Sequence, residues 1–271
     1  MAVQFQHPNI TVFESALFRT TSTVVETPDL ILVADPNCLP GEIEAIRGHV
    51  AQIRGERPLY LLFTHSDWDH IIGYRAFEGA KVIASQALRD NPHPEKSLEG
   101  IREFDDEHYI RRSYPIEYPR VDIPIHSDGQ ELILGSTKLI FQLAPGHTPD
   151  GLFTLVDPYG IWLAGDYLSN IEFPFVYHGF KEYLDTLSKA TRMMQEQTVR
   201  LLVPGHGDAT TNKTEMQARI FSSEQYLRKV VRSLQNQMTF DLEEFLKDYS
   251  FPGTLGKYHR ENMELAKKEY A

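Results

Sequence analysis

The sequence predicts an α/β fold with a metal site at the ends of its strands. Strand-like and helix-like segments alternate through the first third of the chain. A buried strand is predicted at residues 59–63, and four potential metal ligands follow it within the six residues His65-Ser66-Asp67-Trp68-Asp69-His70. Ligands bind beyond the carboxyl ends of strands in open α/β sheets. Because imidazole and carboxylate together suit zinc, iron or manganese, this stretch indicates a metalloprotein.

The N-terminal half reads as strands joined by short helices. Segments rich in β-forming residues lie at 10–13, 17–25, 30–34 and 81–84. Between them, residues 41–54 place Ile43, Ile46, Val50 and Ile53 at helical spacing, and residues 71–77 read as a short helix. The charged segment 90–120 carries Leu98, Ile101 and Phe104 at helical spacing, so we expect a helical insertion that caps a pocket. A solvated helix face is the plainer alternative for its charges.

The second half predicts hairpins followed by helices. Strands at 131–134 and 138–143 flank Gly135-Ser136, and strands at 152–156 and 160–164 flank Asp157-Pro158-Tyr159. A helix at 180–197, a strand at 199–203, a helix at 213–237 and two further helical pieces complete the chain. We therefore expect a catalytic domain at 1–211, with the capping insertion at 90–120, and a C-terminal helical extension at 212–271.

Composition excludes several classes of function. With 27 Lys and Arg against 38 Asp and Glu, the formal charge of -11 argues against nucleic-acid binding. The single cysteine, Cys38, cannot form an internal disulfide, so nothing ties the chain to an oxidising compartment. Neither a membrane span nor a signal peptide is legible. We expect a cytoplasmic enzyme acting on a small molecule, with no nucleic-acid or membrane partner, and we leave a homo-oligomer open.

Three further ligand-type residues occur at strand ends, each directly after a glycine. They are His147 in Ala144-Pro-Gly-His, Asp166 in Leu163-Ala-Gly-Asp and His206 in Val203-Pro-Gly-His. Glycine permits a sharp bend of the backbone at such points. A single histidine at a strand end is usually a surface residue, but three such clusters beside the first one favour a shared site.

These motifs resemble the metallo-β-lactamase superfamily, in which a His-x-His-x-Asp-His box is followed by single His, Asp and His ligands. The resemblance covers about residues 12–207, with Asp35 in the place of the family's early structural aspartate. It implies an αββα four-layer sandwich of two mixed sheets with outer helices and two divalent metal ions, zinc, iron or manganese, at one rim. It also implies the ligand set His65, Asp67 and His147 for one metal, Asp69, His70 and His206 for the other, and Asp166 as a bridge.

Asp67 departs from this pattern because the family has histidine there. As a ligand, its carboxylate would harden the first site towards iron or manganese and raise the pKa of a bound water. Two alternatives stay open: Asp67 hydrogen-bonds a ligand from outside the site, or it turns away and leaves the first site weak.

The superfamily fold alone does not select the reaction. The leading hypothesis is a hydrolase of a small ester, thioester or lactone, in which a hydroxide bridging the metals attacks the substrate. Asp69 and Asp166 would be catalytic, with Asp69 orienting the water. A phosphodiesterase of a small phosphodiester is one alternative. A non-catalytic metal-binding or sensing protein is another.

Aromatic residues near the predicted ligands are candidates for a substrate pocket. Trp68 lies inside the box, and Tyr177 and His178 follow Asp166 in an aromatic segment. We predict that they line the site together with Asp35 beneath the box. The plainer interpretation is that these are ordinary core aromatics.

Overall fold

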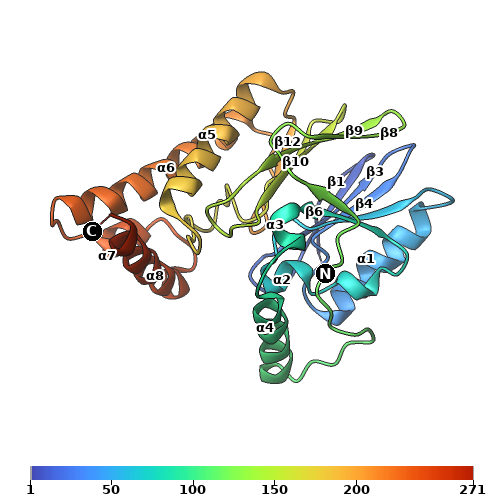
Figure 1. The fold of residues 1–271 in the computed structure, drawn as a ribbon, viewed down its shortest axis with the longest axis horizontal. Coiled ribbons are helices and arrows are strands. Elements are labelled where there is room, and N and C mark those ends of the chain that lie inside the picture. The colour runs from blue at the N-terminus through green and yellow to red at the C-terminus, as the bar shows by residue number, and fades with distance from the viewer. Residues whose placement is uncertain (1, 271) are drawn as a thin grey trace.

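Two β-sheets pack face to face between two layers of helices in the computed structural model, which describes residues 2–270 (Figure 1). The first sheet has seven strands in sequence order, antiparallel from β1 to β4 and parallel from β4 to β7. Its strands are β1 (Ala2–His7), β2 (Ile10–Glu14), β3 (Thr21–Glu26), β4 (Ile31–Ala34), β5 (Leu59–Leu62), β6 (Lys81–Ser85) and β7 (Ile123–Ile125).

The second sheet has five strands, and only its β11–β12 pair is parallel. Across the sheet the order is β12 (Leu201–Val203), β11 (Ile161–Leu163), β10 (Leu152–Asp157), β9 (Thr137–Leu143) and β8 (Glu131–Leu134). Both sheets are therefore mixed, and the predicted αββα sandwich of two mixed sheets with outer helices is confirmed.

Side-chain alternation along the central strands builds the layers. In β5, Leu59 and Leu61 pack in the core beneath the first helical layer, whereas Tyr60 and Leu62 pack in the core between the sheets. Successive side chains of a strand point to opposite faces, so a strand buried on both faces must be apolar throughout. The uninterrupted apolar run that predicts this strand is thus a consequence of its position in the middle of four layers.

Four helices and one 3-10 turn cover the first sheet: α1 (Pro40–Ile53), α2 (Trp68–Ile71), η1 (Tyr74–Ala76), α3 (Gln86–Arg89) and α4 (Pro94–Glu107). α4 is the helix of the predicted insertion, and its apolar face of Leu98, Ile101 and Phe104 is buried. The Phe104 ring lies 4.8 Å from the ring of Trp68 in α2. The insertion therefore packs against Trp68, within the His65–His70 segment. Its role as a cap over a pocket stays a prediction.

The other helical layer contains α5 (Phe180–Glu196), α6 (Lys213–Gln235), α7 (Leu242–Leu246) and α8 (Pro252–Tyr270). One hydrophobic core joins these helices to the second sheet, because Trp162 and Leu202 belong to the same buried cluster as Tyr226 and Leu255. Figure 1 shows the C-terminal helices beside α5 at one end of the molecule. The core thus continues across residue 211, where the sequence predicts a domain boundary.

The strands and helices differ from expectation at a few ends. The strand predicted from residue 17 begins only at Thr21, because Phe18 and Arg19 have positive φ values of 55° and 50° and form a turn. The helix predicted from residue 71 begins at Trp68, so the box opens a helix. Strands β1 and β7 were not expected. None of the helices between residues 2 and 270 has the length and apolar composition needed to cross a bilayer.

Candidate metal centre

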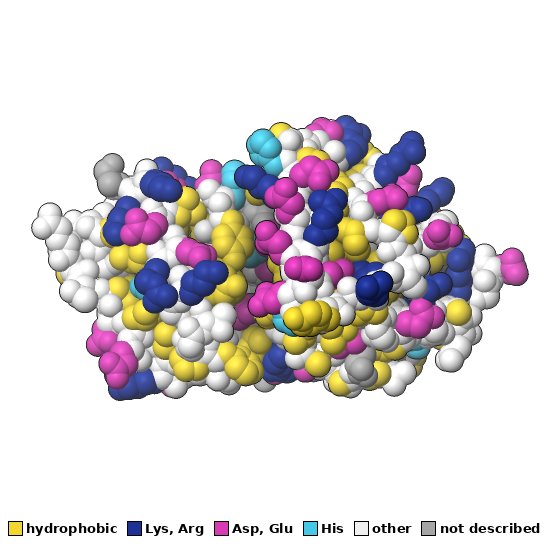
Figure 2. Space-filling view, turned by 90° about the horizontal axis from the view of Figure 1, so that it is seen from below, with side chains coloured by type: hydrophobic (Ala, Val, Ile, Leu, Met, Phe, Trp, Pro, Cys, Tyr) yellow, Lys and Arg dark blue, Asp and Glu magenta, His cyan; other side chains and the backbone are white. Residues whose placement is uncertain are grey.

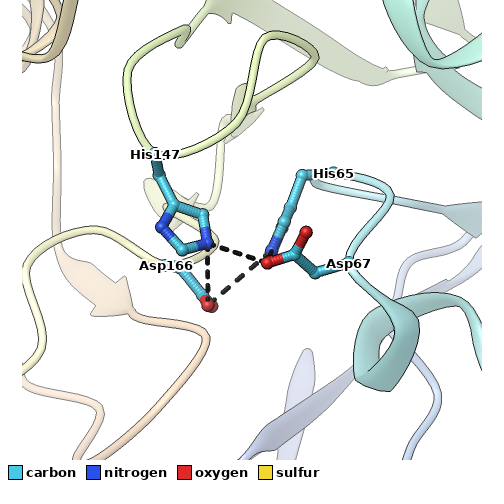
Figure 3. Close-up of side chains that lie close together, drawn as sticks. All are labelled: His65, Asp67, His147 and Asp166. Carbon is cyan, nitrogen blue, oxygen red and sulfur yellow. Dashed lines mark ion pairs between the residues drawn. The ribbon is translucent and has the colours of Figure 1, made fainter. Parts of the chain in front are cut away.

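The predicted ligands meet at one rim of the sandwich, where strands of both sheets end. His65 follows β5, His147 follows β9, and Asp166 and His206 follow β11 and β12. The ligand atoms of His65, Asp67, His147 and Asp166 form one group, and those of Asp69, His70 and His206 form a second, each group spanning no more than 4.8 Å. Figure 3 shows the four side chains of the first group pointing toward one another.

Asp166 lies between the two groups. Its Oδ2 atom is 3.3 Å from His147 Nε2 and 3.7 Å from His65 Nε2 in the first group, and 3.4 Å from His206 Nε2 in the second. Its Oδ1 atom is 3.0 Å from His70 Nε2. One carboxylate therefore faces every histidine of the site, as a shared ligand of two cations must.

Asp67 points into the site. Its Oδ2 atom lies 3.2 Å from His147 Nε2 and 3.8 Å from His65 Nε2 (Figure 3). The residue occupies the N-cap position of α2 but makes no side-chain capping hydrogen bond there, so its carboxylate is free to face the histidines. The Asp67 carboxylate therefore lies beside the Nε2 atoms of both histidines of the first group.

Each histidine is oriented by an oxygen atom at its Nδ1. The acceptors are Thr64 Oγ1 for His65, Asp35 Oδ2 for His70, the Phe175 carbonyl for His147 and the Phe18 carbonyl for His206, at 2.8–3.0 Å. Thr64 Oγ1 donates its own proton to Asp35 Oδ2 at 2.5 Å, so it accepts from His65. Donation from Nδ1 leaves the Nε2 lone pair of each ring facing the centre, which is the arrangement of metal-bound histidines.

The donor atoms fit a pair of divalent cations. Within the described residues, His65 Nε2, His70 Nε2, His147 Nε2 and Asp166 Oδ1 are buried without any hydrogen-bond partner. Buried polar atoms normally have partners, so this concentration needs an explanation. Donors around one tetrahedral ion with bonds of about 2.0–2.2 Å lie about 3.4 Å apart, close to the separations within each group. The residues present thus suit two cations in number, chemistry and spacing.

The cluster carries excess negative charge that cations would neutralise. Burial opposes protonation of His147, yet the nearby carboxylates of Asp166 and Asp67 raise the pKa of its imidazole well above the usual range. Burial also opposes protonation of His206, but the nearby charges of Asp166 and Glu172 outweigh it and raise the pKa of His206 to about 10. His65 behaves differently, because burial and the neighbouring His70 lower its pKa to about 4. Metal ligands must be deprotonated, so a metal ion that binds here would displace the protons from these imidazoles.

Glycine is required beside the ligands because the loops pack without room for a side chain. A Cβ atom at residue 205 would overlap Asp166 Oδ1 and lie 3.0 Å from the His70 ring. Gly165 has φ of +53° and would bring a Cβ within 2.9 Å of Thr64 Oγ1, which orients His65. The Gly-Asp and Gly-His pairs of the sequence therefore mark close contact between ligand loops as well as a sharp bend.

The sequence profile of the metallo-beta-lactamase superfamily matches residues 17–206, most of the chain and all of the ligand loops. The chain belongs to this superfamily. No curated protein matches it in sequence.

Solved structures with the same fold span most of the chain. A metallo-beta-lactamase family protein from Thermus thermophilus is 18% identical, with a TM-score of 0.62 over 97% of this chain and 95% of that chain. A Cronobacter sakazakii metallo-beta-lactamase is 21% identical, with a TM-score of 0.59 over 84% of this chain and 93% of that chain. A double mutant of the sec-alkyl sulfatase PisA1 is 14% identical, with a TM-score of 0.67, and covers 98% of this chain but 49% of its own. At these identities the likeness concerns fold alone.

The predicted pocket residues lie at the edge of this superfamily site. The Trp68 ring is half-buried between Phe104 and the exposed Phe18, at 4.8 Å and 6.1 Å. The Tyr177 ring is 46% exposed and its centroid lies 5.0 Å from that of His147. His178 is exposed, and its backbone N–H donates to the carbonyl of His147 at 3.1 Å. Tyr177 thus lies beside the ligand His147, whereas the Trp68 ring contacts Phe104 and Phe18.

Sequence reasoning missed three groups at the site. The Phe18 and Phe175 carbonyls orient His206 and His147, and a backbone acceptor leaves no trace in residue type. Glu172 is the third: it lines a small cavity together with His147 and Asp166, and burial raises the pKa of its carboxyl. The sequence feature that could have indicated Glu172 is its position as the one acidic residue in the otherwise apolar run Ile171–Val176.

Proposed function

We propose that this protein is a metal-dependent hydrolase of a small ester, thioester or lactone. The observation that carries the proposal is the position of Asp166, which faces the histidines of both ligand groups. His65, Asp67, His147 and Asp166 would hold one divalent ion, and Asp69, His70, His206 and Asp166 the other. A pair of such ions supplies Lewis acidity and lowers the pKa of water, which is the chemistry hydrolysis needs.

Asp69 is proposed to handle the proton. Its Oδ2 lies 3.5 Å from His206 Nε2 and 3.8 Å from His70 Nε2, at the mouth of the second group. Its carboxyl is buried beside both imidazoles of the second group, within reach of a water molecule held there. Asp69 would orient the attacking water and receive its proton.

The single cysteine, Cys38, does not compete with water as the nucleophile at this centre. Cys38 is fully buried in the core beneath the first helical layer, and burial raises the pKa of its thiol far above neutrality. Thiol attack requires the thiolate, so Cys38 is unreactive.

Charge around the centre favours an uncharged substrate over a phosphodiester. Three carboxylates, Asp67, Asp69 and Asp166, lie among the ligands, and Glu172 and Asp35 stand directly behind them. Figure 2 shows a hollow between α4 and the C-terminal helices, with acidic side chains gathered on the α4 side. Metal ions would offset the carboxylates among the ligands, but the acidic side chains on the wall of the hollow remain and repel anionic ligands, not neutral ones. The full set of inward-facing ligands favours an enzyme over a degenerate metal-binding protein.

The test combines metal content with a matched set of substrates. The protein is expected to bind two equivalents of zinc, iron or manganese and to hydrolyse aryl esters, thioesters or lactones faster than a phosphodiester with the same aryl leaving group. Oxygen-18 from solvent should enter the acid product in a single turnover. Two bound equivalents without turnover of any of these substrates would contradict the proposal and indicate a metal-binding or sensing protein. Trapping of an acyl-enzyme would refute hydrolysis by water.

A further inference from the structure

The segment that orients His147 is held in place by the C-terminal helix. The Phe175 carbonyl accepts from His147 Nδ1 at 2.8 Å. On either side of it, the Pro174 carbonyl accepts from Asn262 Nδ2 at 2.7 Å, and the Val176 N–H donates to Asn262 Oδ1 at 2.9 Å. One buried amide of α8 therefore holds the peptide group that carries the acceptor, through the Val176 N–H, and the peptide group before it, through the Pro174 carbonyl.

Asn262 is itself fixed by a hydrogen-bonded chain inside the helical layer. Its Nδ2 also donates to Tyr226 Oη of α6 at 2.9 Å, and that hydroxyl donates to His259 Nδ1 at 3.0 Å. Asn262 is 1% exposed, so each of these polar atoms depends on a protein partner. The amide consequently has a single orientation, with Oδ1 toward Val176 and Nδ2 toward Pro174.

A second contact from α8 acts on the same segment. The Tyr258 ring, one turn before Asn262, stacks on the Phe175 ring at 4.0 Å and 23°. Phe173, at the other side of Pro174, packs 4.4 Å from the Tyr226 ring of α6. Residues 173–177 are thus clamped to the C-terminal helices by hydrogen bonds and by aromatic packing.

We propose that α8 positions the metal ligand His147, with Asn262 as the positioning residue and Tyr258 as its support. The proposal rests on the proposed function, because it takes His147 to be a ligand. His147 is the member of the first group that reaches Asp67 at 3.2 Å and Asp166 at 3.3 Å, so displacement of its ring weakens that group selectively. The histidines of the second group take their acceptors from Asp35 and Phe18, which α8 does not touch in the hydrogen bonds described.

The test measures zinc and manganese affinity of each site in Asn262→Ala, by competition with a chelator. Loss of an outer hydrogen bond to a metal-binding histidine costs about tenfold or more in affinity. Asn262→Ala removes the support of the Phe175 carbonyl that accepts such a bond, so we expect a loss of up to about tenfold for one of the two equivalents, with the other unchanged. In the metal-free protein, amide hydrogen exchange should accelerate at Val176 and Tyr177 while the sheets stay protected.

Two further variants make the outcome decisive. Tyr258→Ala removes only the half-buried stacking ring, so it tests the clamp even if Asn262→Ala does not fold, and it should also weaken one equivalent. Glu269→Ala is the matched control: its carboxylate accepts from the Phe180 and Lys181 N–H groups at 2.8 and 3.1 Å, tying α8 to α5 and not to residues 173–177. It should leave both affinities unchanged.

The possible failures are distinguishable. Equal weakening of both equivalents, or unchanged affinity in Tyr258→Ala and Asn262→Ala, overturns the positioning role while leaving the metal centre intact. A parent protein that binds no second equivalent overturns the proposed function, and this inference with it.

Discussion

Asp35 Oδ2 lies 3.0 Å from His70 Nδ1 and also accepts the proton of Thr64 Oγ1, which in turn orients His65. One buried carboxylate of the first sheet therefore controls a histidine in each ligand group. Asp35 has a positive φ of 47° and is 4% exposed, so the chain keeps it in an unfavourable backbone conformation beneath the box.

Replacement of Asp35 by asparagine should weaken both metal equivalents. The variant keeps the size of the side chain but loses the charge that holds the two imidazoles, and such changes cost about 10–100-fold in metal affinity. Chelator competition measures the effect. Asp29→Asn is the control, since Asp29 also accepts several hydrogen bonds, from Ser136 and Thr137, but lies away from the site. Unchanged affinity in Asp35→Asn would show that the charge of Asp35 does not hold the two imidazoles in place.

Asp166→Ala should release both metal equivalents and abolish turnover. Its carboxylate approaches His65, His147, His206 and His70 within 3.0–3.7 Å, so neither group is complete without it. Metal content after gel filtration gives the direct measurement. Asp185→Ala, an exposed acid on α5, should retain both equivalents. Retention of two tightly bound ions by Asp166→Ala would rule out a shared ligand.

The sequence predicts the buried strand and the ligand loops because each has a local signature, whereas the four layers were implied by the resemblance to the superfamily. Strand burial is visible in the apolar run before His65. Close contact between loops is visible in the glycines that precede His147, Asp166 and His206. Residue type alone reveals both. The link between α8 and His147 has no such signature. It passes through the carbonyls of Pro174 and Phe175, and backbone groups are the same in every residue.

Gly205→Ala should destabilise the site even though alanine is the smallest change available. The new methyl would overlap the Asp166 carboxylate and press on the His70 ring, so we expect a lower melting temperature and weaker metal binding. Gly48→Ala makes the matched comparison, because Gly48 lies in α1 and a Cβ there meets nothing within 4 Å. It should stabilise the protein by roughly 0.5–1 kcal/mol through helix propensity. Equal behaviour of the two variants would contradict the packing argument.

His259 makes the stability of the helical layer sensitive to acid. Burial, with Arg260 and Lys229 nearby, lowers the pKa of His259 to about 4, and its neutral Nδ1 accepts from Tyr226 Oη. Between its ordinary pKa of about 6.5 and this value the unfolded chain binds a proton that the folded chain does not, so stability falls as the pH falls through this window. Denaturation midpoints across this range should decline more steeply for the parent than for His259→Gln. Parallel pH profiles would show that His259 titrates normally in the fold.

Asp67→His should change the metal preference of the first group. Asp67 Oδ2 lies 3.2 Å from His147 Nε2 and faces the site, so an imidazole there would replace a charged oxygen donor by a neutral nitrogen donor. Carboxylate favours harder ions such as manganese, whereas imidazole suits zinc. After equilibration with equal concentrations of zinc and manganese, the variant should carry more zinc per chain than the parent. Asp106→His, at an exposed position of α4, controls for the added histidine. If the variant and the parent take up the two metals in the same ratio, Asp67 is not a ligand, and its carboxylate serves only to hydrogen-bond His147.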